Sequence, residues 1–279
     1  MEVSMDFKTY FDFADNQKIM DIAYSVFPGI PGNSEIHFKE AIRNGYHGMK
    51  ADMQLSKDGK IILCHDDGYT FDENGMITSF APDKFTAIHD LTAGEINDLL
   101  FAQAWGGEHH RPCQLETMLQ LCRDHNRFAY LTLRDDPWRP EVVARMVELL
   151  RQYEMTGRTV VNFYPPQPGA VQLIDSLCPG LKYCHTLVPN TPLSEQLIDD
   201  SAAGGYNIIC LCGLTNGIFD KRLAERAEAT GIHIWCWGLK TIEAISTAVK
   251  CGVTGFQMFM PSGTPDMLAQ YFPSQIDLC

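Results

Sequence analysis

Short apolar segments alternate with longer amphipathic segments along the whole chain. The short segments are rich in β-branched and aromatic residues and favour strands, whereas the amphipathic spacing of the longer ones favours helices. This pattern predicts eight strands, at Ile19–Ala23, Gly48–Leu55, Phe128–Leu133, Thr159–Phe163, Leu181–Leu187, Asn207–Leu211, His233–Trp237 and Gly255–Phe259.

Helices are predicted between the strands, and several have clear end signals. Asn33 or Ser34 is an N-cap for the first of them, and Gly45 follows its last turn. The predicted helices are Ser34–Asn44, Leu115–Asp124, Glu141–Tyr153, Ala170–Leu177, Ser194–Ala203, Lys221–Thr230 and Thr241–Lys250, with a last short one after Pro265.

Eight strands, each followed by a helix, predict an α/β fold of the (β/α)8 TIM barrel type, at the usual chain length for that fold. An open doubly wound sheet is the alternative, but no glycine-rich phosphate loop follows the first strand. We expect one barrel domain over residues 1–279. Residues 68–111 are too many for an ordinary loop and predict an insertion, with a helix start at Leu91–Glu95. His109 and His110 are expected in a solvated part of it.

Composition limits the possible partners. The net charge of −13 argues against nucleic acid and against an anionic membrane. No run of eighteen apolar residues predicts a membrane-spanning helix, and the first residues, which include acids, do not resemble a signal peptide. Ten cysteines, mostly within apolar segments, are expected to be buried free thiols in a reducing cytoplasm. Cys210 and Cys212 are too closely spaced for the usual zinc motif.

The segment Gly48–Asp67 contains the most informative motif. It reads as a strand, a Ser-Lys-Asp-Gly turn at Ser56–Gly59, a second strand, and then His65. Alternation along the first strand places Lys50, Asp52 and Gln54 on one face.

This segment resembles the signature of the glycerophosphodiester phosphodiesterase family, which has Glu-x-Asp on the strand, Thr-Lys-Asp-Gly in the turn and His-Asp after it. Asp52 and His65 match that signature, whereas Lys50 stands at the position of the Glu. Weaker similarities follow in the family's order at Ala41–Gly45, Arg111–Cys122, His233–Gly238 and Gly252–Pro261. The resemblance implies a phospholipase C-like phosphodiesterase barrel acting in lipid or glycerol metabolism.

The resemblance also implies a calcium or magnesium ion, held by the two acids of Glu-x-Asp and by a Glu on the third strand, and two catalytic histidines. In this chain the third-strand Glu falls on Thr132. The His-Arg-Gly that ends the family's first strand falls on Ala23–Ser25. One carboxylate is a poor ligand set for either ion, so we expect no bound metal and no other cofactor.

The same substitutions indicate another use of the site. Lys50 and Arg134 are candidate phosphate-binding residues, and Asp52 and His65 are candidate catalytic residues. Lys50 and Asp52 could equally form an internal ion pair that fills an inactive site, and His65 could simply bond Asp66. His185 and His233 are the candidates to replace the missing histidine, although His233 also fits the barrel floor.

Four further residues are predicted to line a substrate pocket: Tyr24, Thr132, Trp235 and Trp237. Both tryptophans also suit the hydrophobic core. Asp135 and Asp136 are either ordinary rim acids or replacement metal ligands.

Two functions follow from these residues. The first is a phosphodiesterase whose activity is weak or independent of metal and whose partner is a small phosphorylated molecule. The second is a non-catalytic protein that binds a phosphorylated or sugar-like ligand in the same cleft.

Overall fold

The computed structural model describes residue 11 and residues 19–24, 29–78, 84–133, 140–164, 169–213, 220–239 and 241–258. Eight parallel strands form a closed barrel, because β1 pairs with both β2 and β15. In order around the barrel they are β1 (Met20–Ala23), β2 (Gly48–Leu55), β10 (Phe128–Leu133), β11 (Thr159–Phe163), β12 (Lys182–Thr186), β13 (Ile208–Cys212), β14 (His233–Trp237) and β15 (Gly255–Met258). The predicted TIM barrel is confirmed.

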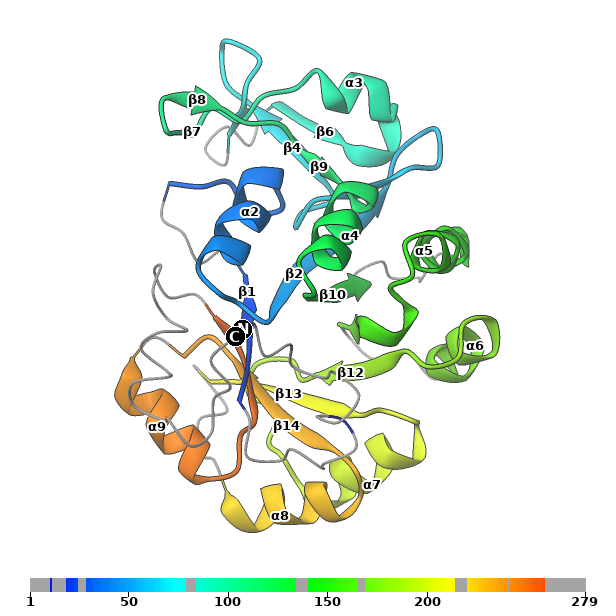
Figure 1. Ribbon diagram of the computed structural model, residues 1–279, viewed down its shortest axis with the longest axis vertical. Helices are drawn as coiled ribbons and strands as arrows, with labels where there is room; N and C mark the ends of the chain where they lie inside the picture. Colours follow the sequence, from blue (N-terminus) through cyan, green and yellow to red (C-terminus); the bar gives the residue numbers. More distant parts are fainter. Residues whose placement is uncertain are drawn as a thin grey trace.

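Helices surround the barrel on its outer side (Figure 1). The Ser34 hydroxyl caps the first of them by accepting from the His37 N–H, and Gly45 adopts a φ of +79° just after its end. These helices are α2 (Glu35–Arg43), α4 (Leu115–Asp124), α5 (Pro140–Gln152), α6 (Ala170–Leu177), α7 (Glu195–Ala203), α8 (Lys221–Ala229) and α9 (Ile242–Lys250). The helix predicted after Pro265 lies outside the described residues.

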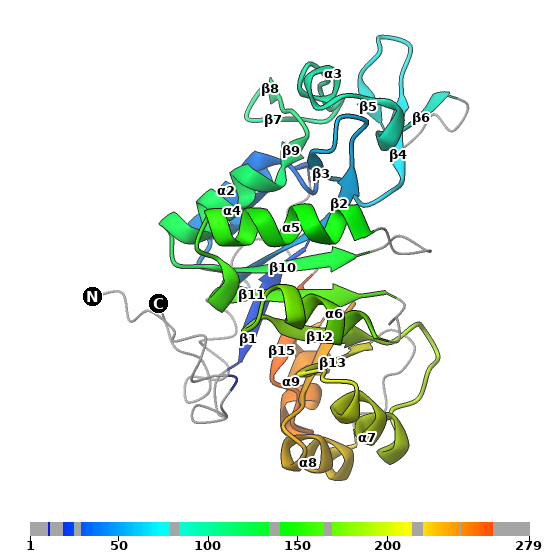
Figure 2. The same cartoon turned by 90° about the vertical axis from the view of Figure 1, so that its right-hand side faces the viewer.

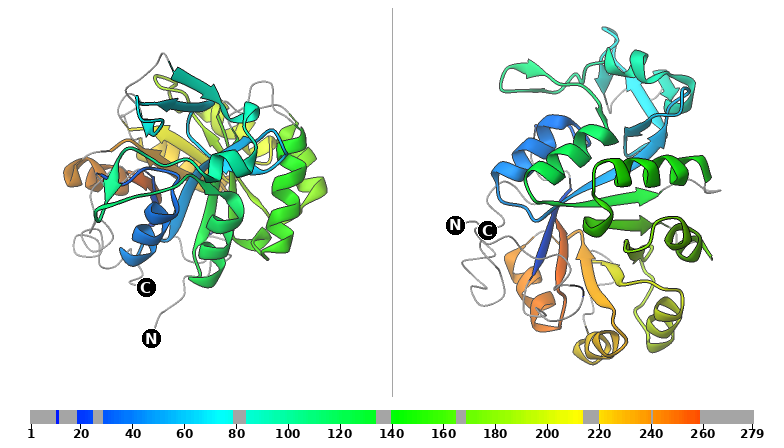
Figure 3. Two further views of the ribbon diagram at one scale, coloured as in Figure 1. Left: turned by 90° about the horizontal axis from the view of Figure 1, so that it is seen from above. Right: turned by 45° about the vertical axis from the view of Figure 1, so that its right-hand side comes forward.

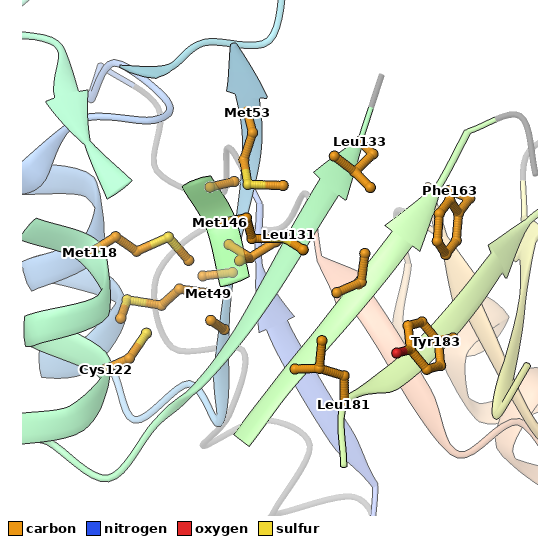
Figure 4. Close-up of a cluster of buried hydrophobic side chains, with 14 of the residues drawn as sticks. Met49, Met53, Met118, Cys122, Leu131, Leu133, Met146, Phe163, Leu181 and Tyr183 are labelled. Atoms are coloured by element: carbon orange, nitrogen blue, oxygen red, sulfur yellow. The ribbon is translucent and has the colours of Figure 1, made fainter. Parts of the chain in front are cut away.

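The two faces of the barrel strands pack against different partners, as alternation requires. Outward side chains meet the helices, and Figure 4 shows Met49 and Leu131 beside Met118 of α4 and Met146 of α5. Inward side chains fill the barrel itself. The inward apolar cluster consists of Met20, Ile22, Phe128, Tyr130, Val160, Cys184, Ile208, Cys210 and Trp235, with Phe11 against it.

The chain between β2 and α4 forms an insertion with its own short elements. β3 (Ile61–Leu63) pairs antiparallel with β2, and β9 (Cys113–Gln114) pairs with β3, so both ends of the insertion are attached to the barrel sheet. Between them lie β4 (Gly68–Phe71), β5 (Ile77–Thr78), β6 (Phe85–Ala87), α3 (Ala93–Asn97), β7 (Ala104–Trp105) and β8 (Glu108–His109).

This region, expected as a loop insertion, therefore contains five short strands and a capped helix among its described residues. The Thr92 and Glu95 side chains form a reciprocal capping box at the start of α3. The insertion has its own buried cluster, which includes Ile62, Tyr69 and Ile88. Figures 2 and 3 show it beyond the end of β2, on the side of α2 and α4 and away from α7 and α8.

Among the described residues, no helix is long and apolar enough to cross a membrane. The nine described cysteines are free thiols, and all but Cys251 are buried, as the sequence predicted.

Candidate functional site

The register of β2 directs Lys50 and Asp52 into the barrel. Lys50 lies opposite Tyr130 of β10, and Asp52 lies opposite Thr132, one inward position closer to the carboxyl ends of the strands. Active sites of TIM barrels lie at those ends. The expected inward orientation of the two charged residues is therefore confirmed.

Lys50 and Asp52 form a buried ion pair. The Lys50 ammonium lies 2.7 Å from one Asp52 carboxylate oxygen and 2.8 Å from the other. The Lys50 side chain is 8% exposed and that of Asp52 is fully buried. The ammonium also lies 3.9 Å from the centre of the Tyr24 ring, a distance suited to a cation–π contact. This arrangement fixes the positive charge next to the Tyr24 ring at the end of β1.

His65 follows β3 at the same end of the barrel. Its Nδ1 lies 2.8 Å from a carboxylate oxygen of Asp66, and its side chain is 46% exposed. The His65 and Tyr24 rings have centroids 6.2 Å apart. Tyr24 is thus in contact range of both the Lys50 ammonium and the His65 ring, so the structure brings these predicted site residues together.

A set of hydrogen bonds links inward side chains at the same level of the barrel as this pair. The Asn162 amide donates to the Thr132 hydroxyl at 3.3 Å and accepts from the Thr186 hydroxyl at 2.6 Å. The Gln257 amide donates to the Tyr130 hydroxyl at 2.8 Å. Burial raises the pKa of Tyr130 well above its ordinary value, so the phenol remains neutral. These groups form a neutral polar network at the level of the charged pair.

Sequence reasoning had included Thr132 but missed the rest of this network. Asn162, Thr186 and Gln257 are polar residues within apolar strands. Each stands at an inward position according to the barrel register. The alternation of inward and outward positions along each strand could have identified them. A polar side chain at an inward position is expected to have a hydrogen-bond partner there.

The two tryptophans of β14 occupy different environments. Trp235 is fully buried, and its ring stacks on that of Tyr130 with centroids 5.9 Å apart. It therefore belongs to the barrel core, and its assignment to the pocket wall is wrong. Trp237 lies one inward position closer to the carboxyl ends, opposite Gln257, and is partly exposed.

Neither candidate for the second histidine lies at the carboxyl ends beside His65. His185 is on the outer face of β12, where its Nδ1 lies 2.9 Å from the Ser201 hydroxyl of α7, and burial lowers its pKa. His233 begins β14, so it lies at the amino end of the barrel, and it is packed edge-on against Phe11. The proposal that either residue replaces the missing histidine is therefore wrong. His185 points out of the barrel, and His233 lies at the opposite end of the barrel from His65.

Other predicted residues lie elsewhere. Arg134, Asp135 and Asp136 fall outside the described residues. His109 and His110 are on the insertion, where one ring nitrogen of each lies within hydrogen-bond distance of a backbone carbonyl oxygen. Both line a cavity of about 470 Å³ between α2 and the insertion, away from the Lys50–Asp52 pair.

The acids of this site do not fit a divalent cation. Calcium and magnesium require several oxygen ligands, and here both oxygens of Asp52 already contact the Lys50 ammonium. Within the described parts of the chain, no three His, Cys, Asp or Glu side chains are grouped so as to hold a metal ion.

The fold and the site define this protein as a TIM barrel with a polar site at the carboxyl ends of its strands. The sequence model of the glycerophosphoryl diester phosphodiesterase family matches residues 29–258. The chain therefore belongs to the glycerophosphoryl diester phosphodiesterase family.

Individual relatives are distant in sequence. The glycerophosphodiester phosphodiesterase of Caldanaerobacter subterraneus subsp. tengcongensis is 22% identical over 234 residues, which cover 81% of this chain and 87% of that protein. A crystal structure from Parabacteroides distasonis, of a glycerophosphoryl diester phosphodiesterase, aligns with a TM-score of 0.72 at 15% identity, over 98% of this chain and 93% of that one. The structure of a phosphodiesterase from Oleispira antarctica, solved with sn-glycerol 3-phosphate, aligns with a TM-score of 0.72 at 16% identity. The alignment covers 89% of this chain and 96% of that one. At these identities the structural comparisons establish the fold.

Proposed function

We propose that this protein is a glycerophosphodiester phosphodiesterase with a degenerate active site, which binds a small phosphorylated ligand and hydrolyses phosphodiesters slowly and without a divalent cation. The observation that carries the proposal is the Lys50–Asp52 pair. Lys50 places a covalently attached positive charge where the family resemblance places an acidic metal ligand.

Lys50 and Tyr24 would bind the anionic part of the ligand. The Lys50 ammonium holds a positive charge next to the Asp52 carboxylate and the Tyr24 ring. This ammonium would stabilise the negative charge that develops on a phosphate oxygen during hydrolysis. Arg134, predicted at the end of β10, would add a second positive charge.

His65 would transfer protons. An imidazole is suited to general acid–base catalysis near neutral pH, and a carboxylate partner such as Asp66 orients the ring. The nearby Cys64 thiol is poorly suited to that role, because burial raises its pKa to about 12. A single proton-transfer group without a metal supports slow turnover.

Non-catalytic binding is the second candidate. It is favoured because both carboxylate oxygens of Asp52 contact the Lys50 ammonium. Because the Asp52 carboxylate is fully buried and contacts the ammonium through both oxygens, it is poorly placed to activate a nucleophile. The cleft would then bind a phosphorylated or sugar-like molecule without cleaving it.

The test is release of sn-glycerol 3-phosphate from glycerophosphocholine, with and without EDTA, together with direct binding of sn-glycerol 3-phosphate. We expect a slow rate that EDTA leaves unchanged and that His65→Ala reduces by a factor of about 100 or more. His89→Ala is the matched control, because His89 and Asp90 form a similar neighbouring pair on the insertion, 3.7 Å apart.

The outcomes separate the alternatives. A rapid rate abolished by EDTA contradicts the degenerate site. Binding of sn-glycerol 3-phosphate without turnover selects the non-catalytic function.

A further inference from the structure

Two buried glutamines stand at inward positions of β2 and β15, the two strands that flank β1, and they differ in their hydrogen bonds. Gln257 of β15 is 5% exposed, and its amide nitrogen lies 2.8 Å from the Tyr130 hydroxyl and 3.2 Å from the Cys210 thiol. Gln54 of β2 is 3% exposed, and its amide nitrogen has no hydrogen-bond partner in the described structure.

Gln54 lies where the barrel meets the insertion. It is two residues beyond Asp52, so it shares the inward face of Lys50 and Asp52 and lies further toward the carboxyl ends. Met53 pairs with Leu133 of β10 and with Leu63 of β3, and Gln54 pairs with Ile62 of β3. Figure 2 shows this part of β2 running into the insertion next to β3.

The surroundings of Gln54 contain a second polar group of the same kind. Cys64 lies opposite Asp52, where its backbone N–H donates to the Asp52 carbonyl at 2.9 Å. The Tyr69 hydroxyl is also buried, and the Cys64 thiol is its polar neighbour. The region where β2 meets β3 therefore contains two uncharged donor groups, the Gln54 amide and the Tyr69 hydroxyl, on the insertion side of the Lys50–Asp52 pair.

A buried amide without a partner destabilises the protein that contains it, because it loses its hydrogen bonds to water and gains none. A ligand oxygen at the carboxyl ends of the strands would provide the missing acceptor, in the part of a TIM barrel where ligands bind.

We propose that Gln54 is a specificity-determining residue whose amide donates to a hydroxyl oxygen of the ligand's alcohol portion. This inference rests on the proposed function, in which Lys50 and Tyr24 contact the phosphate. A neutral amide complements an uncharged hydroxyl, and its position beyond Asp52 extends the site past the phosphate. The ligand class is therefore a phosphorylated polyol rather than a bare phosphate.

The first measurement is thermal unfolding of the ligand-free protein. Gln54→Met, which keeps the length of the side chain and removes the amide, is expected to leave the midpoint unchanged or raise it. Gln257→Met is the matched control and is expected to lower the midpoint by about 2–4 °C, because it breaks existing hydrogen bonds. A comparable loss of stability in Gln54→Met would show a structural partner and overturn the proposal.

The second measurement compares binding of sn-glycerol 3-phosphate and inorganic phosphate by calorimetry. We expect the wild type to prefer sn-glycerol 3-phosphate by about tenfold, the ratio that one ordinary hydrogen bond supplies. Gln54→Met is expected to lose that preference while binding inorganic phosphate unchanged. Gln54→Asn, which retains the amide but withdraws it by one methylene, is expected to lose it as well.

The outcomes distinguish this inference from the proposed function. If the wild type binds both ligands equally, or if the preference persists in both variants, the role of Gln54 is wrong and phosphate binding stands. If the wild type binds neither ligand, the proposed function itself is wrong, and the inference is overturned with it.

Discussion

The ammonium of Lys50 contacts both carboxylate oxygens of Asp52, at 2.7 and 2.8 Å, inside the barrel. These residues occupy the two positions at which the family signature has a pair of acids. An internal cation therefore compensates the charge of Asp52. Because both side chains are almost completely withdrawn from water, each depends on the other for compensation.

Removing one member of this pair is expected to cost more stability than removing both. Lys50→Met leaves a buried carboxylate, and Asp52→Leu leaves a buried ammonium, so each should lower the free energy of unfolding by about 3–5 kcal/mol. The double variant should recover most of that loss. Urea denaturation of the four proteins measures the coupling, and additive losses would contradict it.

Restoring acids is expected to create a calcium site. Lys50→Glu combined with Thr132→Glu gives three carboxylates together with Asp52, which is the ligand set implied by the family resemblance. Calcium should then raise the unfolding midpoint of the double variant and leave that of the wild type unchanged. Adding Asp52→Asn is the control and should abolish the effect. A calcium-dependent shift in the wild type would contradict the present account of the site.

The polar network inside the barrel is expected to contribute to stability. Asn162→Leu removes the bonds to Thr132 and Thr186 and leaves two buried hydroxyl groups to find other partners. The free energy of unfolding should fall by about 1–3 kcal/mol. Exposed Asn97 is the control, and Asn97→Ala should change stability by less than about 0.5 kcal/mol. Equal effects of the two substitutions would show that the network contributes nothing.

His37 of α2 is expected to make the protein less stable in mild acid. Burial lowers its pKa from 6.5 to about 4 in the folded protein. The folded state therefore favours the neutral ring, and its stability is complete above pH 6.5 and declines as the pH falls toward 4. Complete protonation of His37 would lower the free energy of unfolding by roughly 3 kcal/mol. His37→Leu should flatten the decline between pH 6.5 and 5, where few carboxylates titrate; an unchanged slope in denaturant titrations would contradict this prediction.

The alternation of strands and helices was readable in the sequence because it depends on local periodicity. The boundaries of β2, β10, β11 and β14 agree with prediction, and Ser34 and Gly45 mark the ends of the first barrel helix as their chemistry requires. The insertion was recognised by its length, but not its strands. Segments of two or three residues, such as β5 and β7, are too short to produce a periodic signal.

The sequence by itself determined the fold and the inward face of β2, since parity alone places Lys50 and Asp52 together. Only the tertiary structure decided which distant residues join them. Asn162, Thr186 and Gln257 come from three other strands, and barrel closure sets their register. Barrel closure likewise directs His185 outward to α7 and leaves the amide nitrogen of Gln54 without a hydrogen-bond partner among the described residues. Local periodicity cannot specify such relations, because they depend on how separate strands align around a closed sheet.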